Sequence, residues 1–111
     1  MSMASEDLAE RIRNVMPPRL VYSEKKMFGG RAFMMNGNML VCPTKEGALI
    51  VRVGQGAMEE ALARPGAEVM VMNGRSMRDF VVLPGDAIED DDALAGWLQL
   101  AQAFVTTLPP K

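Results

Sequence analysis

Apolar residues recur with a helical period at both ends of the chain. Near the N-terminus this pattern predicts a helix over residues 5–16, with Ser5 as the N-cap, and its stripe consists of Leu8, Ile12, Val15 and Met16. Near the C-terminus it predicts a helix over residues 91–108, with a stripe formed by Leu94, Trp97, Leu98, Ala101, Phe104, Val105 and Leu108. A shorter apolar face predicts a middle helix over residues 57–63.

Short apolar runs between these helices predict β-strands. Asn36-Gly37 separates the runs 31–35 and 38–42, and this dipeptide is the strongest two-residue hairpin signal because a type I′ turn needs positive φ twice. A regular hairpin around it would place Phe33 opposite Leu40. Further runs predict strands at residues 48–53, 68–72 and 79–83.

The dipeptide Gly29-Gly30 has two interpretations. It can be a second tight hairpin turn, which would make residues 25–28 a strand, or a kink that leads into the strand at Arg31. Local turn rules favour the hairpin. The predicted fold class is α+β, an antiparallel sheet with packed helices.

Several predicted strands are apolar at successive positions, as in Phe33-Met34-Met35, Met39-Leu40-Val41 and Leu49-Ile50-Val51. A strand with one face in water should alternate between apolar and polar residues. Something is therefore expected to cover both faces of the sheet. The candidates are helices on each side, a homodimer or another protein surface; we favour a second surface, and coverage by the chain itself stays open.

The composition indicates one globular domain spanning residues 1–111. Its 111 residues are 49% hydrophobic and 23% charged, which suffices for a single core. The chain carries neither a signal-peptide pattern nor a run of about 20 apolar residues, so we expect a cytoplasmic protein without a membrane span. The single cysteine, Cys42, excludes an internal disulfide and a zinc site built on several thiolates.

The residue types argue against catalysis. Histidine is absent, which removes the usual general base and the commonest metal ligand. Cys42 lies in an apolar run and is expected to pack as a small hydrophobic residue. The acidic residues from Asp86 to Asp92 complement a helix N-terminus. We therefore expect no enzyme, no catalytic residue, no cofactor and no metal.

Basic residues near glycine turns are the candidate site for an anion or a partner. Formal net charge is -2, so we do not expect direct nucleic-acid binding. The candidate residues are Lys25, Lys26, Gly29, Gly30, Arg31, Arg52, Arg75 and Arg78. Methionine occurs 11 times and either fills the core or forms an adaptable docking face.

Four segments in this order resemble the TfoX N-terminal domain family over residues 6–108. They are Lys26-Met27-Phe28-Gly29-Gly30-Arg31-Ala32-Phe33, Gly37-Asn38-Met39, Leu49-Ile50-Val51-Arg52-Val53 and Met77-Arg78-Asp79-Phe80. The resemblance implies a fold similar to that of secretion chaperones, in the order helix, three strands, helix, two strands, helix. Three strands before the middle helix favour the kink at Gly29-Gly30 and reduce residues 25–28 to a loop or short edge piece.

Function is also implied by the resemblance. Full-length TfoX/Sxy proteins are bacterial regulators of natural competence and add a C-terminal domain. This chain ends at Lys111 without that domain, so a direct competence role is not expected. The predicted function is a non-enzymatic regulatory module that binds an unidentified protein partner, with a homodimer as one form. The alternative is a small-anion or nucleotide-binding module at the Gly29-Gly30 and Arg75–Arg78 turns.

Overall fold

The computed structural model describes residues 3–16, 21–27, 30–44, 47–72 and 74–109, with side chains for all of these except 3–5, 27, 72 and 78. Within these ranges the chain forms three α-helices and six β-strands. The helices are α1 (Met3–Val15), α2 (Met58–Leu62) and α3 (Asp91–Val105). The strands are β1 (Ser23–Met27), β2 (Gly30–Met35), β3 (Asn38–Pro43), β4 (Leu49–Arg52), β5 (Glu68–Met72) and β6 (Arg75–Leu83).

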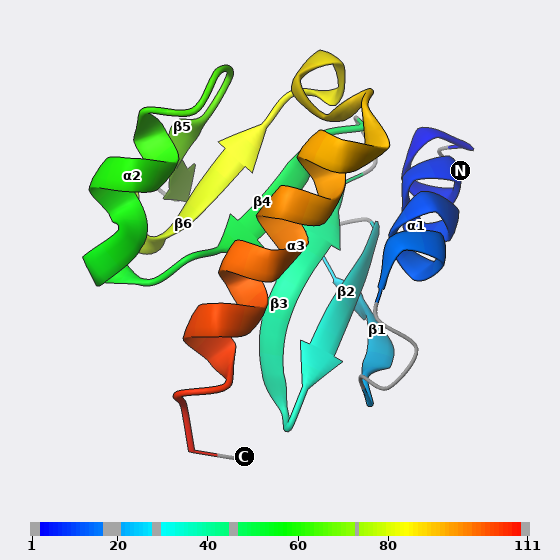
Figure 1. The fold of residues 1–111 in the computed structure, drawn as a ribbon, viewed down its shortest axis with the longest axis horizontal. Coiled ribbons are helices and arrows are strands. Elements are labelled where there is room, and N and C mark those ends of the chain that lie inside the picture. The colour runs from blue at the N-terminus through cyan, green and yellow to red at the C-terminus, as the bar shows by residue number, and fades with distance from the viewer. Residues whose placement is uncertain (1–2, 17–20, 28–29, 45–46, 73, 110–111) are drawn as a thin grey trace.

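The six described strands form one antiparallel sheet in the order β1-β2-β3-β4-β6-β5. The chain therefore crosses from β4 past α2 and returns through the hairpin β5–β6, whose second strand pairs with β4. In Figure 1, α3 runs across the front of the sheet while α1 and α2 flank it. The predicted α+β class is confirmed.

The hairpin at Asn36-Gly37 has the predicted turn geometry. Asn36 has φ 55° and Gly37 has φ 81°, the two successive positive values that a type I′ turn requires. Met35 pairs with Asn38 across the turn. Asparagine and glycine enter this backbone region at the least steric cost, so the dipeptide determines the turn locally.

Two residues beyond that turn, the predicted pairing is wrong. The ladder shifts between Phe33 and Met34, so Phe33 lies opposite Val41 rather than Leu40. The irregularity is a β-bulge, which places two residues of one strand against one of its neighbour. Leu40 and Val41 are adjacent, and both are buried in the core beneath the helices, which strict alternation would not allow.

The expectation that residues 25–28 form a loop or edge piece is also wrong. Residues 23–27 form β1, which pairs antiparallel with β2 from Ser23–Met34 to Met27–Gly30, so four strands precede α2 and the hairpin interpretation is correct. Residues 28 and 29 of this connection lie outside the described residues. Gly30 itself cannot carry a side chain, because a Cβ there would collide with the carbonyl oxygen of Pro43.

The described helices begin at different kinds of boundary, and a side-chain cap sets the start of α3. Asp90 caps α3, since its carboxylate accepts a hydrogen bond from the Asp92 backbone N–H at 3.1 Å, and the helix ends at Val105, three residues before the predicted end. The first helix begins at Met3, so Ser5 lies inside it and is not the N-cap. A single 3₁₀ turn, Gln55–Ala57, precedes the short α2.

All three helices pack on one face of the sheet and form the main core there. The helices contribute Leu8, Ala9, Ile12, Ala61, Leu94, Trp97, Leu98, Ala101 and Val105. The strands and connections contribute Met16, Phe33, Met35, Leu40, Val41, Leu49, Val51, Val53, Val81, Leu83 and Ile88. We call this the helix-covered face. In the described part of the chain, no helix combines the length and hydrophobicity that a membrane span requires.

Ion pairs fasten α1 to the edge of this face. Arg13 donates two hydrogen bonds to the Glu24 carboxylate, at 2.8 and 2.7 Å, and this contact lowers the pKa of Glu24 and raises the pKa of Arg13. Arg31 lies 3.3 Å from Glu6 and 3.6 Å from Glu24. Elsewhere on α1, the Arg11 guanidinium lies 3.0 Å from the carboxylate of Asp91, the first residue of α3.

Candidate functional site

The opposite face of the sheet carries a second hydrophobic cluster. Its buried members are Ala32, Met39, Cys42, Ile50 and Met70, and the half-buried residues packed against it are Met34, Met77, Phe80 and Val82. Every one of these residues belongs to a strand, and none comes from a helix. We call this surface the helix-free face, and it is the candidate functional site.

Strand residues alone bury the centre of the helix-free face. Ala32 and Cys42 are 0% exposed and Ile50 is 4% exposed, although no described helix packs over them. Longer thioether side chains, those of Met34, Met39, Met70 and Met77, share the cluster with these shorter residues. Methionine is unbranched and polarizable, so it can cover small neighbours and rearrange when another surface arrives. The centre of this face is therefore apolar, and its outer side chains are adaptable.

One row of residues crosses the helix-free face from edge to edge. In the backbone register, Lys25 on β1 lies opposite Ala32 on β2. At the far edge, Glu68 on β5 lies opposite Val82 on β6. Between them the sheet pairs Cys42 with Ile50 and Ile50 with Val82. The pairing of Phe33 with Val41 places Ala32 beside Cys42 and completes the row.

The ends of this row carry opposite charges. Lys25 and Glu68 are exposed, and neither makes an ion pair with any described residue. Glu68 was not among the predicted site residues. The sequence places Glu68 at the start of a strand, but only the crossing of β6 between β4 and β5 puts that strand at the edge opposite Lys25.

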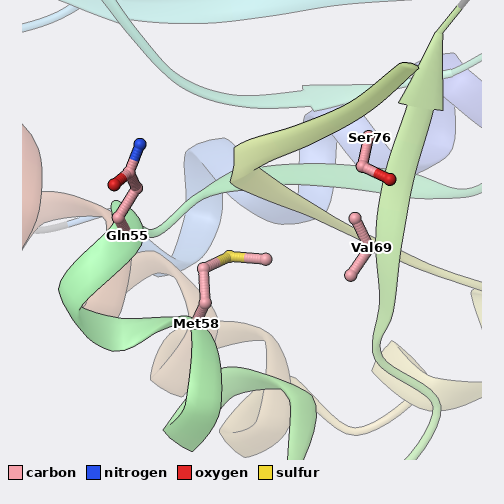
Figure 2. Close-up of a pocket in the computed structure, with 4 residues that line it drawn as sticks. All are labelled: Gln55, Met58, Val69 and Ser76. Atoms are coloured by element: carbon pink, nitrogen blue, oxygen red, sulfur yellow. The ribbon is translucent and has the colours of Figure 1, made fainter.

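A separate open pocket lies between α2 and the β5–β6 hairpin. Its volume is about 350 Å³, and it is lined by Gln55, Met58, Val69 and Ser76. Figure 2 shows Met58 extending toward Val69, with Gln55 on the side of α2 and Ser76 on the side of β6. The lining offers apolar contact with one amide and one hydroxyl. These groups can bind a ligand but include no nucleophile–base pair.

A neighbouring hollow of about 280 Å³ shares Gln55 and Ser76 with this pocket and adds Met77, Asp79 and Phe80. Sequence reasoning missed both, because Gln55 and Ser76 come from segments about 20 residues apart that only the packing of α2 on β6 brings together. Among the described residues, no group of His, Cys, Asp or Glu is arranged to hold a metal ion.

Arg52, one of the predicted binding residues, makes contacts within the fold. Its guanidinium lies 5.6 Å from the ring centres of both Phe80 and Phe104, and 3.9 Å from the Asp79 carboxylate. The side chain is only 18% exposed, and its Nε atom is buried without a hydrogen-bond partner among the described residues. These cation–π contacts link Phe80 on the sheet to Phe104 on α3, so Arg52 stabilises the packing of α3 on the sheet.

The other predicted basic residues fall into two groups that β3 and β4 separate. Lys25, Lys26 and Arg31 lie on β1 and β2, where Arg31 is already paired with two carboxylates. Arg75 is exposed at the start of β6. Gly30 begins β2, Gly29 is outside the described residues, and so is the side chain of Arg78. Anion binding by either group stays a prediction.

Cys42 lies on the helix-free face with its thiol in an apolar setting. It is fully buried, and that burial raises its pKa to about 11. Because the thiolate is the reactive form, such a thiol is a poor nucleophile at neutral pH. Its position fits the packing role predicted for it.

Comparisons with known proteins identify the family of this chain. The model of the TfoX N-terminal domain family matches residues 18–105 of the 111. No curated protein and no solved structure matches the chain significantly. The matched residues include all six described strands, α2 and α3, that is, both faces of the sheet. On this evidence, the chain belongs to the TfoX N-terminal domain family.

Proposed function

We propose that this domain is a non-enzymatic regulatory module that binds another protein surface through its helix-free face. The observation that carries the proposal is the second apolar cluster, which extends from β2 to β5 and receives no helix residue. Contiguous apolar surface of this kind marks an interaction site in soluble domains. We place the protein in the cytoplasm.

The chemistry of the face supports protein binding over binding of a small ligand. The cluster spreads over five neighbouring strands, well beyond the hollow that Met77 and Phe80 line, whereas a small-molecule site is a single concave pocket. Methionine is enriched at interface cores and lets one surface fit partners of different shape. A regulatory role accords with the family resemblance.

The absence of catalysis is part of the proposal. The chain has no histidine, and its one thiol is held neutral by burial. The pocket beside α2 presents an amide, a hydroxyl and apolar walls, and its neighbouring hollow adds a single carboxylate. These groups suit recognition better than acid–base chemistry.

A pair of valine substitutions tests the proposal. Val82 lies half-buried on the helix-free face, and Val82→Lys would place a charge there. Val71 is 62% exposed, and strand alternation points it away from the face to which Met70 belongs, so Val71→Lys is the matched control. Circular dichroism and thermal unfolding would establish that both variants fold.

Tagged wild-type and variant chains would be cross-linked to their partners in native cells and compared by quantitative mass spectrometry. The protein captured by the wild type would then be purified and titrated against all three chains by calorimetry. We expect Val82→Lys to weaken that complex at least about tenfold and Val71→Lys to leave it unchanged. Equal affinity for all three chains would remove the helix-free face as the docking surface.

A further inference from the structure

The charges on the helix-free face restrict what can cover it. Lys25 and Glu68 end the same transverse row, and the four residues between them are apolar: Ala32, Cys42, Ile50 and Val82. A matching surface must therefore present a negative group opposite Lys25, a positive group opposite Glu68 and an apolar strip between. The sheet itself has this pattern when it is turned end for end.

Symmetry decides how two such faces can meet. A two-fold axis that lies between the sheets and runs parallel to the strands brings the β1 edge of one copy over the β5 edge of the other. Lys25 then faces Glu68 at both ends of the row. An axis along the row would instead place Lys25 against Lys25 and Glu68 against Glu68, which like-charge repulsion disfavours. Face-to-face packing with nearly aligned strands is the ordinary arrangement of a β-sandwich.

We propose that the occupant of the helix-free face is a second copy of this chain, related by a two-fold axis parallel to the strands. Lys25 of each copy pairs with Glu68 of the other, and Met34, Met77, Phe80 and Val82 form the apolar contact. This inference rests on the proposed function, because it names the partner of the same face.

A second copy satisfies the charge pattern without further assumptions. An isologous interface repeats each contact, so one Lys–Glu pairing supplies complementarity at both ends. An unrelated partner would need both charges and the apolar strip placed independently. Six strands at a spacing of about 4.8 Å give a face roughly 24 Å wide. A reversible dimer with a dissociation constant of about 1–10 μM is the expected result.

Charge exchange tests this arrangement. Lys25→Glu would oppose two carboxylates at each end of the dimer, and Glu68→Lys would oppose two ammonium groups. The double variant Lys25→Glu/Glu68→Lys restores opposite charges at both contacts. Lys26→Glu is the matched control. Lys26 is exposed on the same strand, lies opposite Arg31 in the β1–β2 ladder, and points to the helix-covered face.

Sedimentation velocity at about 50 mM salt would report the dimer, since exposed charges are poorly screened there. Each single reversal should raise the dissociation constant roughly tenfold, and the double variant should return it to within about threefold of the wild type. Lys26→Glu should leave it unchanged. The double variant can restore the affinity only if Lys25 and Glu68 lie close together. Because four strands separate them within one copy, that contact must form between two copies.

Three results would overturn the second copy as occupant: a wild-type chain that stays monomeric at about 100 μM, a dimer insensitive to either reversal, or single variants that the double variant does not rescue. The proposed function has a separate readout. If the chain is monomeric and Val82→Lys still loses a captured partner, protein binding stands and only the dimer fails. If the dimer is absent and Val82→Lys binds every partner as well as the wild type, both fail.

Discussion

The two faces of the sheet are built from the same strands but differ in what covers them. The helix-covered face buries branched and aromatic residues beneath α1, α2 and α3. The helix-free face buries Ala32, Cys42 and Ile50 together with two methionines, and it receives no helix residue. Successive side chains of a strand point to opposite faces, so β2, β3, β4 and β6 contribute to both clusters.

This difference in residue types indicates that one apolar face stabilises the fold and the other is suited to bind a partner. Branched and aromatic residues have few rotamers and specify one packing, which suits the face that fixes the fold. Methionine has three rotatable bonds and specifies packing poorly, which suits a face whose outer layer has to meet another surface. Burial alone does not distinguish the two faces, whereas methionine content does: four of the nine described residues in the helix-free cluster are methionine, against three of the 28 in the helix-covered cluster.

The largest expected effect is on the helix-covered face. Phe33 is fully buried there, with its ring centre 5.6 Å from that of Tyr22. Phe33→Ala would leave a cavity under the helices and should lower the free energy of unfolding by about 3–5 kcal/mol. Urea denaturation would measure the loss. A loss below about 1 kcal/mol would show that this core is looser than its packing implies.

A smaller effect is expected for a buried residue of the helix-free face. Met39→Ala should cost about 2 kcal/mol, the lower end for such truncations, because neighbouring methionines can move into the space. Urea denaturation at low protein concentration would measure it without contribution from a partner. Met39→Leu, which conserves volume, should cost less than about 1.5 kcal/mol. A Met39→Ala loss that matches that of Phe33→Ala would end the distinction between the faces.

The charges at the rims of the two faces should differ as well. The hydrogen bonds from Arg13 lower the pKa of Glu24, and both side chains are partly exposed. Glu24→Gln should therefore cost at most about 1 kcal/mol at pH 7. A depressed pKa gives stability that is present above the ordinary value of 4.5 and lost as the pH falls through the folded value, so the difference from wild type should vanish in acid.

Lys25→Ala is the comparison for that ion pair. Lys25 is exposed on the helix-free face and has no ionic partner among the described residues of its own chain. Its removal should change the stability of the monomer by no more than about 0.5 kcal/mol. Thermal unfolding from pH 3 to pH 8 would compare the two variants. A larger, pH-dependent loss for Lys25→Ala would reveal an intrachain role.

The smallest effect on stability near neutral pH concerns Cys42, whose reactivity reports how tightly the helix-free face is closed. Burial raises its pKa from 9.0 to about 11, so at pH 8 the folded chain holds about a hundredfold less thiolate than an unfolded one. Reaction with a thiol reagent should be slower by at least that factor, followed spectroscopically. Because the folded pKa is raised, stability should decline only as the pH rises from 9 toward 11. Fast modification at pH 8 would mean that the cluster of the helix-free face opens readily.

Local sequence rules predicted the elements that depend on a few neighbouring residues. Asn36-Gly37 specified its turn, and the acidic residues at Asp90 and Asp91 marked the start of α3. The same rules correctly favoured the hairpin before Gly30. The resemblance implied three strands before the middle helix, and its prediction of a kink there was wrong. The shift of Phe33 to Val41 was beyond them, because a bulge depends on how both strands pack under the helices.

The amino-acid sequence by itself determined that the strands are apolar at successive positions, and with that the existence of two clusters, because alternation along a strand is a local property. Only the tertiary structure decided which face the helices cover. The insertion of β6 between β4 and β5 also placed Lys25 and Glu68 at opposite ends of one row. Strand order arises from long-range pairing, which no short window of sequence encodes.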